Sequence, residues 1–376
     1  MTATFTETVR DWIGLVHDRY PPGQAYDWDN VGLQVGDPGW PVQRILVTLD
    51  VTSAVLDEAA QVEGTLVLAH HPLLFRPLER LTPGTASGRL ALHAARHGIA
   101  VAAAHTNLDV AQDGAGTSTP VATVLDLQDV RPLDTTVTGG GRCKLIAFVP
   151  PEAVDPVIDG VSAAGAGVIG EYDRCSFRVR GTGTFRPLDG ADPYSGTVGE
   201  DAAEDEYRLE VELPQNLAGD VVRALIEAHP YEEVAYDLVP LLDGAEVGLG
   251  LVGELPSPRT LAEVATAIRE HLPAPHLRFA GSPDAEVRRV AVVGGAGDSH
   301  IGAALGAGAD VYVTGDLRHH VTLDALEQGL ALIDAGHHAT EAAAIPAWID
   351  RLTASAEQRG LQAPVVASTT PTVPWR

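Results

Sequence analysis

Residues 65–72 read TLVLAHHP, a short apolar run followed at once by two histidines and a proline. The run has the length of a buried β-strand. Pro72 biases His71 to an extended or turn conformation, so the strand is expected to end there. Because neighbouring side chains of a strand point to opposite faces, His70 and His71 can reach one site only at such an end. A lone His-His pair is more often incidental, so the functional interpretation needs further residues.

Two other stretches repeat the pattern: IAVAAAHTNLD at 99–109 and LALIDAGHHATE at 330–341. In an open parallel α/β sheet, ligands bind beyond the carboxyl ends of the strands, so three such ends can converge on one site. If a helix begins directly after Gly336, His337 and Glu341 lie at i and i+4 on one face. For each stretch alone, a polar loop or a helix-stabilising glutamate is the alternative.

Taken together, the three stretches predict a metal centre. The candidate ligands are His70, His71, Asp109, His337 and Glu341. Histidine nitrogen and carboxylate oxygen suit zinc, manganese, iron or cobalt. Five ligands exceed the four that a tetrahedral zinc ion takes, which favours two ions that share a bridging carboxylate.

Composition bounds the class of protein. A chain of 376 residues is expected to form two or three cores. The net charge of -26 opposes nonspecific binding to nucleic-acid phosphates and favours a small-molecule substrate. Cys143 and Cys175 are too few for a disulfide framework or a thiolate zinc site. No long apolar run or signal pattern is present, so we expect a cytoplasmic protein that makes no membrane contact.

In both outer parts of the chain, predicted strands alternate with predicted helices. After an amphipathic helix over 4–18, the patterns predict strands at 44–50, 65–69 and 99–104 and helices at 53–62 and 88–97. Near the C-terminus they predict strands at 288–294, 309–315 and within 329–338 and helices at 299–306 and 321–328. This favours a pseudo-duplicated α/β core whose halves close one mainly parallel sheet flanked by helices. The alternative to duplication is that any two βαβ stretches resemble each other.

The middle of the chain differs. The predicted order is the strand KLIAFVP, a helix over 152–164, a strand or hairpin across 172–186, the strand EYRLEVELP, a helix over 216–228 and the strand VAYDLVPL. That β-α-β-β-α-β order is ferredoxin-like. The acidic stretch 188–206 is predicted to be a surface loop. We therefore expect an inserted α+β domain over 131–245 between core halves 1–130 and 246–376.

Further polar groups are candidates for substrate contacts and proton transfer. Asp29 and Asn30 lie in WDNVGLQVG, which either lines the pocket or forms a plain turn. His319 and His320 match His70 and His71 in the proposed duplication, and can bind substrate or move a proton. The glycines of GGAG, at 294–297, lack the full dinucleotide fingerprint.

The motifs WDNVGLQVGDP, AHHPLLF, HTNLDVAQDGAGT, TGDLRHH and DAGHHATE occur in this order. The chain thereby resembles the YbgI/YqfO-like family of hexameric proteins with a dinuclear metal centre, the GTP cyclohydrolase I type 2 homologues. The resemblance spans both outer halves. The middle segments CSFRVRGTGTFRP and HPYEEVAYDLVPL resemble the insertion of the longer members, which is similar in fold to PII and CutA trimers.

The resemblance implies that the five candidate ligands hold two divalent ions per subunit, with Glu341 as the bridge. Zinc is the first expectation, and iron, manganese or cobalt are alternatives. His338 stands where other members have a tyrosine, so no ligand role is assigned to it. The resemblance also implies a homohexamer, a trimer of dimers with sites facing an internal cavity.

The implied activity is hydroxide attack at C8 of the guanine ring of GTP, with formate released and His105 or His319 as the proton donor. Two alternatives remain open. One is a metal-dependent phosphoesterase. The other is a non-catalytic hexameric sensor or scaffold, in which the insert supplies an effector surface and the metal stabilises the ring.

Overall fold

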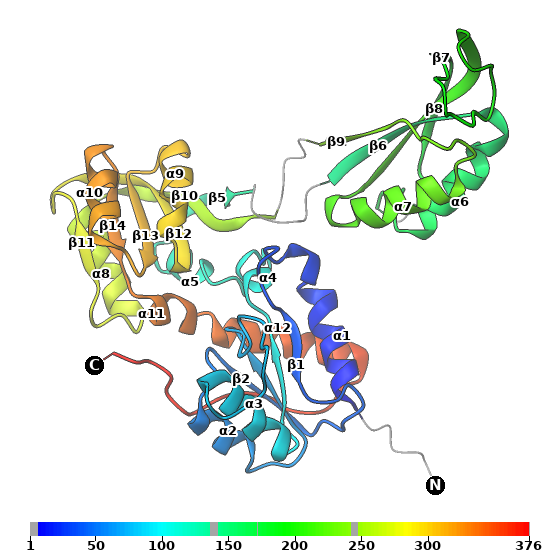
Figure 1. The fold of residues 1–376 in the computed structure, drawn as a ribbon. Helices are drawn as coiled ribbons and strands as arrows, with labels where there is room; N and C mark the ends of the chain where they lie inside the picture. The colour runs from blue at the N-terminus through cyan, green and yellow to red at the C-terminus, as the bar shows by residue number, and fades with distance from the viewer. Residues whose placement is uncertain (1–6, 136–141, 171, 242–246, 376) are drawn as a thin grey trace. The chain divides into compact units, whose positions relative to one another are not determined.

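The computed structural model describes residues 7–135, 142–170, 172–241 and 247–375 (Figure 1). Two compact units form: Gly139–Ala245, and Met1–Thr138 together with Glu246–Arg376. We call them the inserted unit and the core unit. Within the described ranges, no helix is both long enough and apolar enough to cross a membrane.

The core unit contains a five-stranded sheet from its first half. Its order is β1 (Gly32–Val35), β4 (Ala100–Ala103), β3 (Thr65–Ala69), β2 (Arg44–Thr48) and β15 (Val365–Ala367). The last four strands run parallel, and β1 pairs antiparallel with β4. The C-terminal β15 therefore returns to the sheet of the first half.

Apolar side chains cover both faces of this sheet, as parallel strands require. Leu46, Val67 and Val101 pack against α2 (Ser53–Ala59) and α3 (Ala86–Arg96). On the other face, Ile45, Leu66 and Ala102 pack against α1 (Val9–Arg19) and α12 (Ile345–Arg359). The helix predicted over 4–18 thus begins at Val9, and residues 1–6 lie outside the described ranges.

A six-stranded sheet forms from the second half. Its order is β11 (Arg278–Ala280), β14 (Ala331–Asp334), β13 (Val311–Gly315), β12 (Glu286–Ala296), β10 (Leu249–Thr260) and β5 (Gln128–Asp134). Only β12, β13 and β14 run parallel. One face packs against α9 (Ile301–Gly306) and α10 (His319–Glu327), the other against α5 (Thr119–Val124) and α8 (Leu261–His271).

The predicted α/β class, with mainly parallel sheets flanked by helices, is confirmed. The expectation that both halves close one sheet is wrong, because the core unit has two sheets, with β15 joining the sheet of the first half and β5 that of the second. Antiparallel β1 and parallel β15 occupy the two edges of the first parallel triplet, and antiparallel β11 and β10 flank the second. The orders β4-β3-β2 and β14-β13-β12 nevertheless correspond strand by strand.

The inserted unit has one antiparallel sheet of order β7-β8-β6-β9. Its elements are β6 (Arg142–Val149), α6 (Val154–Ala163), β7 (Phe177–Phe185), β8 (Ala202–Pro214), α7 (Ala218–Ala228) and β9 (Tyr236–Pro240). This is a strand-helix-strand-strand-helix-strand succession. Leu145, Leu209 and Val211 bury one face of the sheet under the two helices.

Three boundaries differ from the sequence predictions. The possible hairpin across 172–186 is one strand, β7, which pairs with β8 along its whole length. The start of β8 at Ala202 lies inside the predicted loop over 188–206. The domain boundary expected at residue 131 falls inside β5, which pairs with β10 of the core unit.

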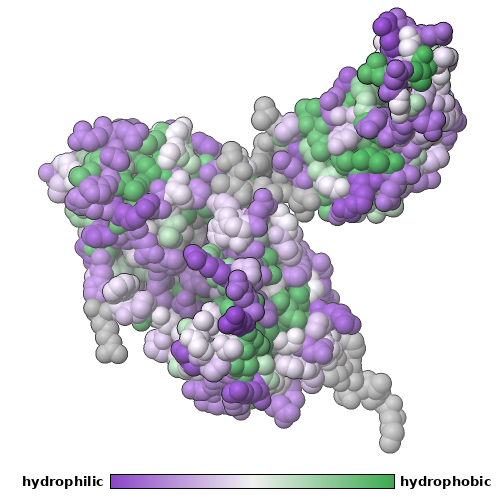
Figure 2. Space-filling model, viewed as in Figure 1, coloured by the Kyte–Doolittle hydropathy of each residue, from purple (hydrophilic) through white to green (hydrophobic). Residues whose placement is uncertain are grey.

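Short helical turns complete the chain. They are the 3-10 turns Pro22–Gln24, Pro151–Ala153, Gln215–Leu217 and Asp298–His300 and the α-helical segments α4 (Thr106–Asp109) and α11 (His337–Ala342). Directly after β4 and β14, α4 and α11 carry polar side chains beyond the strand ends. Polar residues dominate the faces turned to the viewer in Figure 2, with apolar residues in smaller groups between them.

Candidate metal centre

His70 and His71 extend the β2–β3 ladder by two residues. The amide of His70 donates to the carbonyl of Thr48 at 2.9 Å, and that of His71 donates to the carbonyl of Leu49 at 2.8 Å. Both imidazoles therefore lie at the carboxyl end of β3 on a rigid backbone. His70 is buried at 1% exposure.

The other predicted ligands lie on single helical turns. His105 is the N-cap of α4, and Asp109 is its last residue. Gly336 has a φ of 89°, which a residue with a side chain rarely adopts, and it lets α11 begin at His337 immediately after β14. His337 and Glu341 then share one helical face.

These strand ends meet in one cluster. His70 Nε2 lies 3.4 Å from Asp109 Oδ1 and 3.6 Å from Glu341 Oε1. Glu341 Oε2 lies 3.1 Å from His71 Nε2, and Glu341 Oε1 lies 3.2 Å from His337 Nε2. The two Nε2 atoms of His71 and His337 are 3.2 Å apart. The structure thus brings together all five predicted ligands, although they come from two sheets.

The donor set fits a divalent metal. In the described part of the chain, His70 Nε2 and Glu341 Oε2 are buried without a hydrogen bond, although His71 Nε2 lies 3.1 Å from that oxygen. Leaving such atoms unsatisfied is costly. Two groups of donor atoms, each within 4.8 Å, can hold an ion: His70, His71 and His105, and His71, His337 and Glu341.

All four histidines turn Nδ1 away from the cluster toward an oxygen acceptor. The acceptors are Asp50 for His71 (2.8 Å), Asp316 for His337 (2.8 Å), Asp29 for His105 (2.9 Å) and the Ala104 carbonyl for His70 (3.0 Å). The Nδ1–H donates to each acceptor, so Nε2 presents its lone pair inward. Metal-binding histidines are oriented in this way.

Small residues bring the carboxylates into place. The hydroxyl of Thr117 donates to Asp109 Oδ1 at 2.7 Å. Gly295 has a φ of 72°, and a Cβ there would overlap Glu341 Oε1. The amide of Gly295 also donates to Thr340 Oγ1 at 2.9 Å. The GGAG segment therefore permits close packing beneath Glu341.

Charge within the cluster is strongly coupled. Burial opposes protonation of His71, but Asp50 and Glu341 raise its pKa to about 10. Burial likewise opposes protonation of His337, while Glu341 and Asp316 raise its pKa to about 9. Burial disfavours the Glu341 carboxylate, yet the neighbouring imidazoles, His70 first, lower its pKa well below the usual range. Without metal, protons on the imidazoles balance this buried anion, and a divalent ion replaces them.

Asp29 has a different role from the open substrate contact that the sequence suggested. Its side chain is fully buried and accepts hydrogen bonds from His105 and from the backbone and hydroxyl of Thr106. Although burial works against ionisation, these bonds lower the pKa of Asp29 to about 2. Asp29 therefore orients His105. Asn30 is exposed and donates to the Leu74 carbonyl at 2.6 Å.

His319 and His320 are not part of the cluster. Both are exposed at the start of α10, with ring centroids 5.2 Å apart. Among the described residues, neither belongs to a group that can hold a metal. The predicted match to His70 and His71 fails structurally because those residues end a strand, whereas His319 and His320 begin a helix.

The sequence offers WDNVGLQVG as a pocket wall or a plain turn, but it does not reveal the aromatic surface beside His105. Trp28 and Phe75 each have ring centroids 6.2 Å from the His105 ring, and Tyr26 stacks on Trp28 at 5.1 Å. Trp28 is 56% exposed and Phe75 47% exposed. Such open ring faces can stack on a planar ligand. No periodic pattern marks these positions.

Asp50, Asp316 and Thr117 were also missed. Asp50 follows β2 in RILVTLD, and Asp316 follows β13 in VYVTGD. Because both carboxylates lie just beyond strand ends, the argument that singled out the histidines applies to them as well.

Comparison with known proteins places this chain in a family. The family profile described as Duf34/NIF3 (NGG1p interacting factor 3) matches residues 7–374. A Bacillus subtilis protein named "GTP cyclohydrolase 1 type 2 homolog" is 44% identical over 328 residues, 87% of each chain. A protein of the same name from Mycobacterium tuberculosis is 40% identical over 337 residues, 88% of this chain and 87% of that one.

Solved structures agree. The crystal structure of a Bacillus cereus protein related to NIF3 has a TM-score of 0.70 at 37% identity, covering 99% of this chain and 100% of that one. Staphylococcus aureus protein SA1388 has a TM-score of 0.75 at 28% identity, covering 100% of this chain and 99% of that one. With matching sequence, fold and chain length, this chain belongs to the Duf34/NIF3 family.

Proposed function

We propose that the protein is a divalent-metal-dependent hydrolase that acts on a nucleotide or a related small molecule, in the manner of a GTP cyclohydrolase I type 2. The observation that carries the proposal is the convergence of His70, His71 and His337 on Glu341, with buried atoms left unsatisfied. The names of the curated relatives support the choice of reaction.

In this proposal His70, His71, Asp109, His337 and Glu341 would hold two ions, zinc first and iron, manganese or cobalt as alternatives. Glu341 offers one oxygen toward His70 and His337 and the other toward His71, which suits a bridging carboxylate. When bound, the ions would supply Lewis acidity, which makes water a nucleophile at neutral pH and polarises the group under attack.

His105 is the residue best placed to move a proton. Its ring centroid lies 5.1 Å from that of His70 and 5.6 Å from that of His71. Asp29 fixes the ring by accepting from Nδ1, which leaves Nε2 to exchange a proton with a departing nitrogen or oxygen. We therefore prefer His105 to the exposed His319.

The exposed rings of Trp28 and Phe75 support a planar substrate. A purine ring stacked there would lie beside His105 and the metal ligands. We infer that this surface orients the ring, while the imidazoles and Glu341 hold the reacting end.

The test is a turnover assay on protein stripped of metal and reloaded with zinc, manganese, iron or cobalt. With GTP we expect metal-dependent formate release and loss of the absorbance of the intact purine, both abolished in Glu341→Gln. Metal-dependent phosphate release without formate would redirect the proposal to a phosphoesterase. If no metal gives turnover of any nucleotide in a panel, the hydrolase proposal fails.

The assembly is part of the same proposal. From the resemblance to the hexameric family we propose a cytoplasmic homohexamer, built as a trimer of dimers. Its inserted unit would be PII- or CutA-like in fold. Sedimentation equilibrium on the purified chain tests this, and a monomer under all conditions would contradict it.

A further inference from the structure

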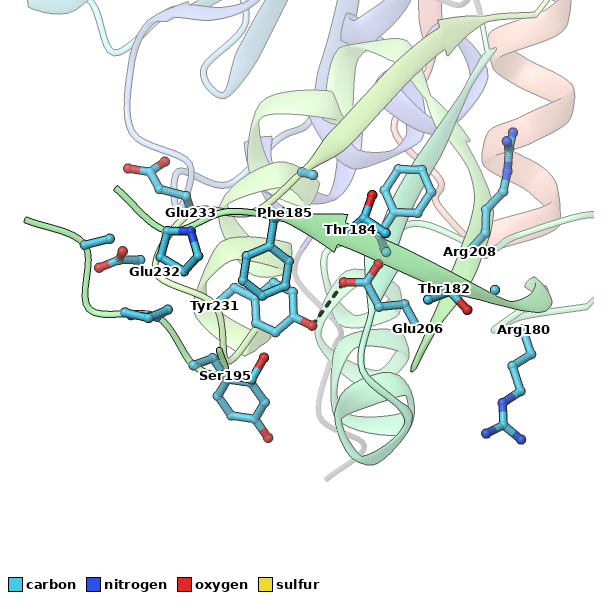
Figure 3. A pocket seen from close by; sticks show the side chains of 18 of the residues that line it. Arg180, Thr182, Thr184, Phe185, Ser195, Glu206, Arg208, Tyr231, Glu232 and Glu233 are labelled. Carbon is cyan, nitrogen blue, oxygen red and sulfur yellow. Dashed lines mark hydrogen bonds between the residues drawn. The ribbon is translucent and has the colours of Figure 1, made fainter. Parts of the chain in front are cut away.

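The inserted unit contains a cavity of about 680 Å³, a size typical of small-molecule sites (Figure 3). It lies between the β7–β8 pair, the segment 187–195 and the segment 231–235. Most of its walls are apolar or aromatic: Phe148, Val179, Phe185, Pro193, Tyr194 and Tyr231. None of these residues belongs to the metal centre.

A buried carboxylate lies in the wall of this cavity. Glu206 is only 8% exposed, and its Oε1 accepts a hydrogen bond from the Tyr231 hydroxyl at 3.0 Å (Figure 3). In the described part of the chain, no Lys, Arg or His forms an ion pair with it. Burying a carboxylate without a cation is costly. The buried His229 also interacts electrostatically with Glu206, but burial lowers the pKa of that imidazole, so it supplies little positive charge.

The backbone makes room for this carboxylate. Gly183 of β7 packs directly against it, and a Cβ at that position would overlap the Glu206 carboxylate. The hydroxyl of Ser195, which also lines the cavity, is buried without a hydrogen-bond partner. The cavity wall therefore carries the Glu206 carboxylate and, among the described residues, a hydroxyl without a partner.

Arg180 and Arg208 line the same cavity, but neither forms an ion pair with Glu206. Arg180 pairs with Asp205, and Arg208 pairs with Glu210 at 3.0 Å. In Figure 3 both side chains extend away from Glu206. Glu232 and Glu233 also line the cavity, and acidic residues outnumber basic ones between 139 and 245. The charge around the cavity therefore favours a cation and opposes a phosphate or carboxylate ligand.

We propose that this cavity binds a small organic cation, an amine or amidine with an apolar or aromatic body. The cationic N–H groups donate to Glu206 and Ser195, and the body packs against Phe148, Phe185 and Tyr194. The rings of Tyr194 and Tyr231, with centroids 5.4 Å apart, add cation–π attraction. The site is separate from the proposed hydrolase centre and does not depend on it.

Three indoles with the same ring and different charge test the proposal on the full chain: tryptamine, the neutral tryptophol and the anionic indole-3-propionate. Equilibrium dialysis at neutral pH measures each affinity. We expect tryptamine to bind at least about tenfold more tightly than tryptophol, since a charge-assisted hydrogen bond is about twice as strong as a neutral one. Indole-3-propionate should bind most weakly.

Matched variants separate the effect of the Glu206 charge from the effect of the position of its carboxylate. Glu206→Gln should reduce tryptamine binding to the level of tryptophol, whereas Glu233→Gln, which removes one negative charge from an exposed position in the same lining, should change it less than about twofold. Gly183→Ala keeps the Glu206 charge but displaces the carboxylate, so it should also remove the preference for the amine. Circular dichroism confirms that each variant is folded.

Several outcomes would overturn the site. These are equal binding of tryptamine and tryptophol, loss of binding in Glu233→Gln as large as in Glu206→Gln, or no binding of any of the three at millimolar concentration. If Glu206→Gln alters the oligomeric state in sedimentation while tryptamine binding persists, Glu206 meets a second copy of the chain and the ligand proposal is wrong.

Discussion

Two buried glutamates, one in each unit, differ in what surrounds them. Glu341 in the core unit is 4% exposed and faces three imidazoles, whereas Glu206 in the inserted unit is 8% exposed and faces one tyrosine hydroxyl. A buried carboxylate is stable only beside a positive charge or hydrogen-bond donors, and this holds for both residues. The neighbouring groups determine the kind of cation: nitrogen donors around Glu341 suit a metal ion, and aromatic walls around Glu206 suit an organic cation.

Removal of metal should abolish function at the Glu341 site and leave ligand binding at the Glu206 site unchanged. After treatment with a chelator, we expect turnover to vanish and the melting temperature of the core unit to fall, because an ion at 1,000 times its Kd stabilises the fold by about 4 kcal/mol. Tryptamine binding at Glu206 should stay within about twofold. Calorimetric scans and dialysis on the same stripped sample measure both. A tryptamine site that disappears with the metal would mean that the two sites are not independent.

His105→Asn tests whether His105, which lies with His70 and His71 in one of the two groups of donor atoms, is a proton donor or a further metal ligand. If His105 transfers a proton, turnover should fall by about 10²- to 10⁴-fold while metal content stays unchanged. Metal analysis beside the formate assay separates the two roles. His320→Asn is the matched control, since that side chain is exposed at the start of α10, and it should retain wild-type turnover. A parallel loss of metal in His105→Asn would make this residue a ligand.

Asp50→Asn removes the carboxylate that orients His71, and Asp316→Asn does the same for His337. Each should weaken metal binding by about 10- to 100-fold, the usual cost of losing such a partner. Competition with a fluorescent zinc chelator measures the affinity. Neither change should alter tryptamine binding. If both leave zinc affinity at the wild-type value, these contacts do not support the metal centre.

The smallest predicted effect is one of pH. The pKa values of His71 and His337 are raised to about 10 and about 9, but their Nε2 atoms lie only 3.2 Å apart, so at pH 7.5 the metal-free pair holds one proton between these two atoms. Each stabilises the metal-free fold fully below the unfolded pKa, about 6.5, and loses that contribution as pH rises through 9 to 10. Zinc binding at pH 7.5 should therefore release a proton from this pair. Titration calorimetry in buffers of different ionisation enthalpy measures that release, and zinc uptake without it would show that the imidazoles are already neutral.

The parallel strands of both halves could be predicted because their apolar runs are continuous and end in polar residues. TLVLA became β3 with the predicted limits, since it is buried on both faces. The edge strands could not be predicted. β5 contains a proline and is largely exposed, and β1 carries too few apolar residues to form a pattern. That the core has two sheets, which exchange the edge strands β5 and β15 between the halves, depends on how edges pair over long distances, which no local pattern encodes.

For the candidate site, the strand-end argument led to residues that the structure brings together. It did not extend to Asp50 and Asp316, although both lie at strand ends, because a lone aspartate after a strand is common. The Glu206 cavity was beyond sequence reasoning. Its carboxylate, the space left by Gly183 and the ring of Tyr231 come from three separate segments, and only the fold makes them neighbours.

Zinc content per chain, measured by atomic emission after chelation and reloading, tests the account most directly when wild type and Glu341→Gln are compared. The account predicts about two ions per wild-type chain. Without the carboxylate that faces His70, His71 and His337, the variant should retain fewer than one. Equal zinc in both proteins, or none in the wild type, would contradict it.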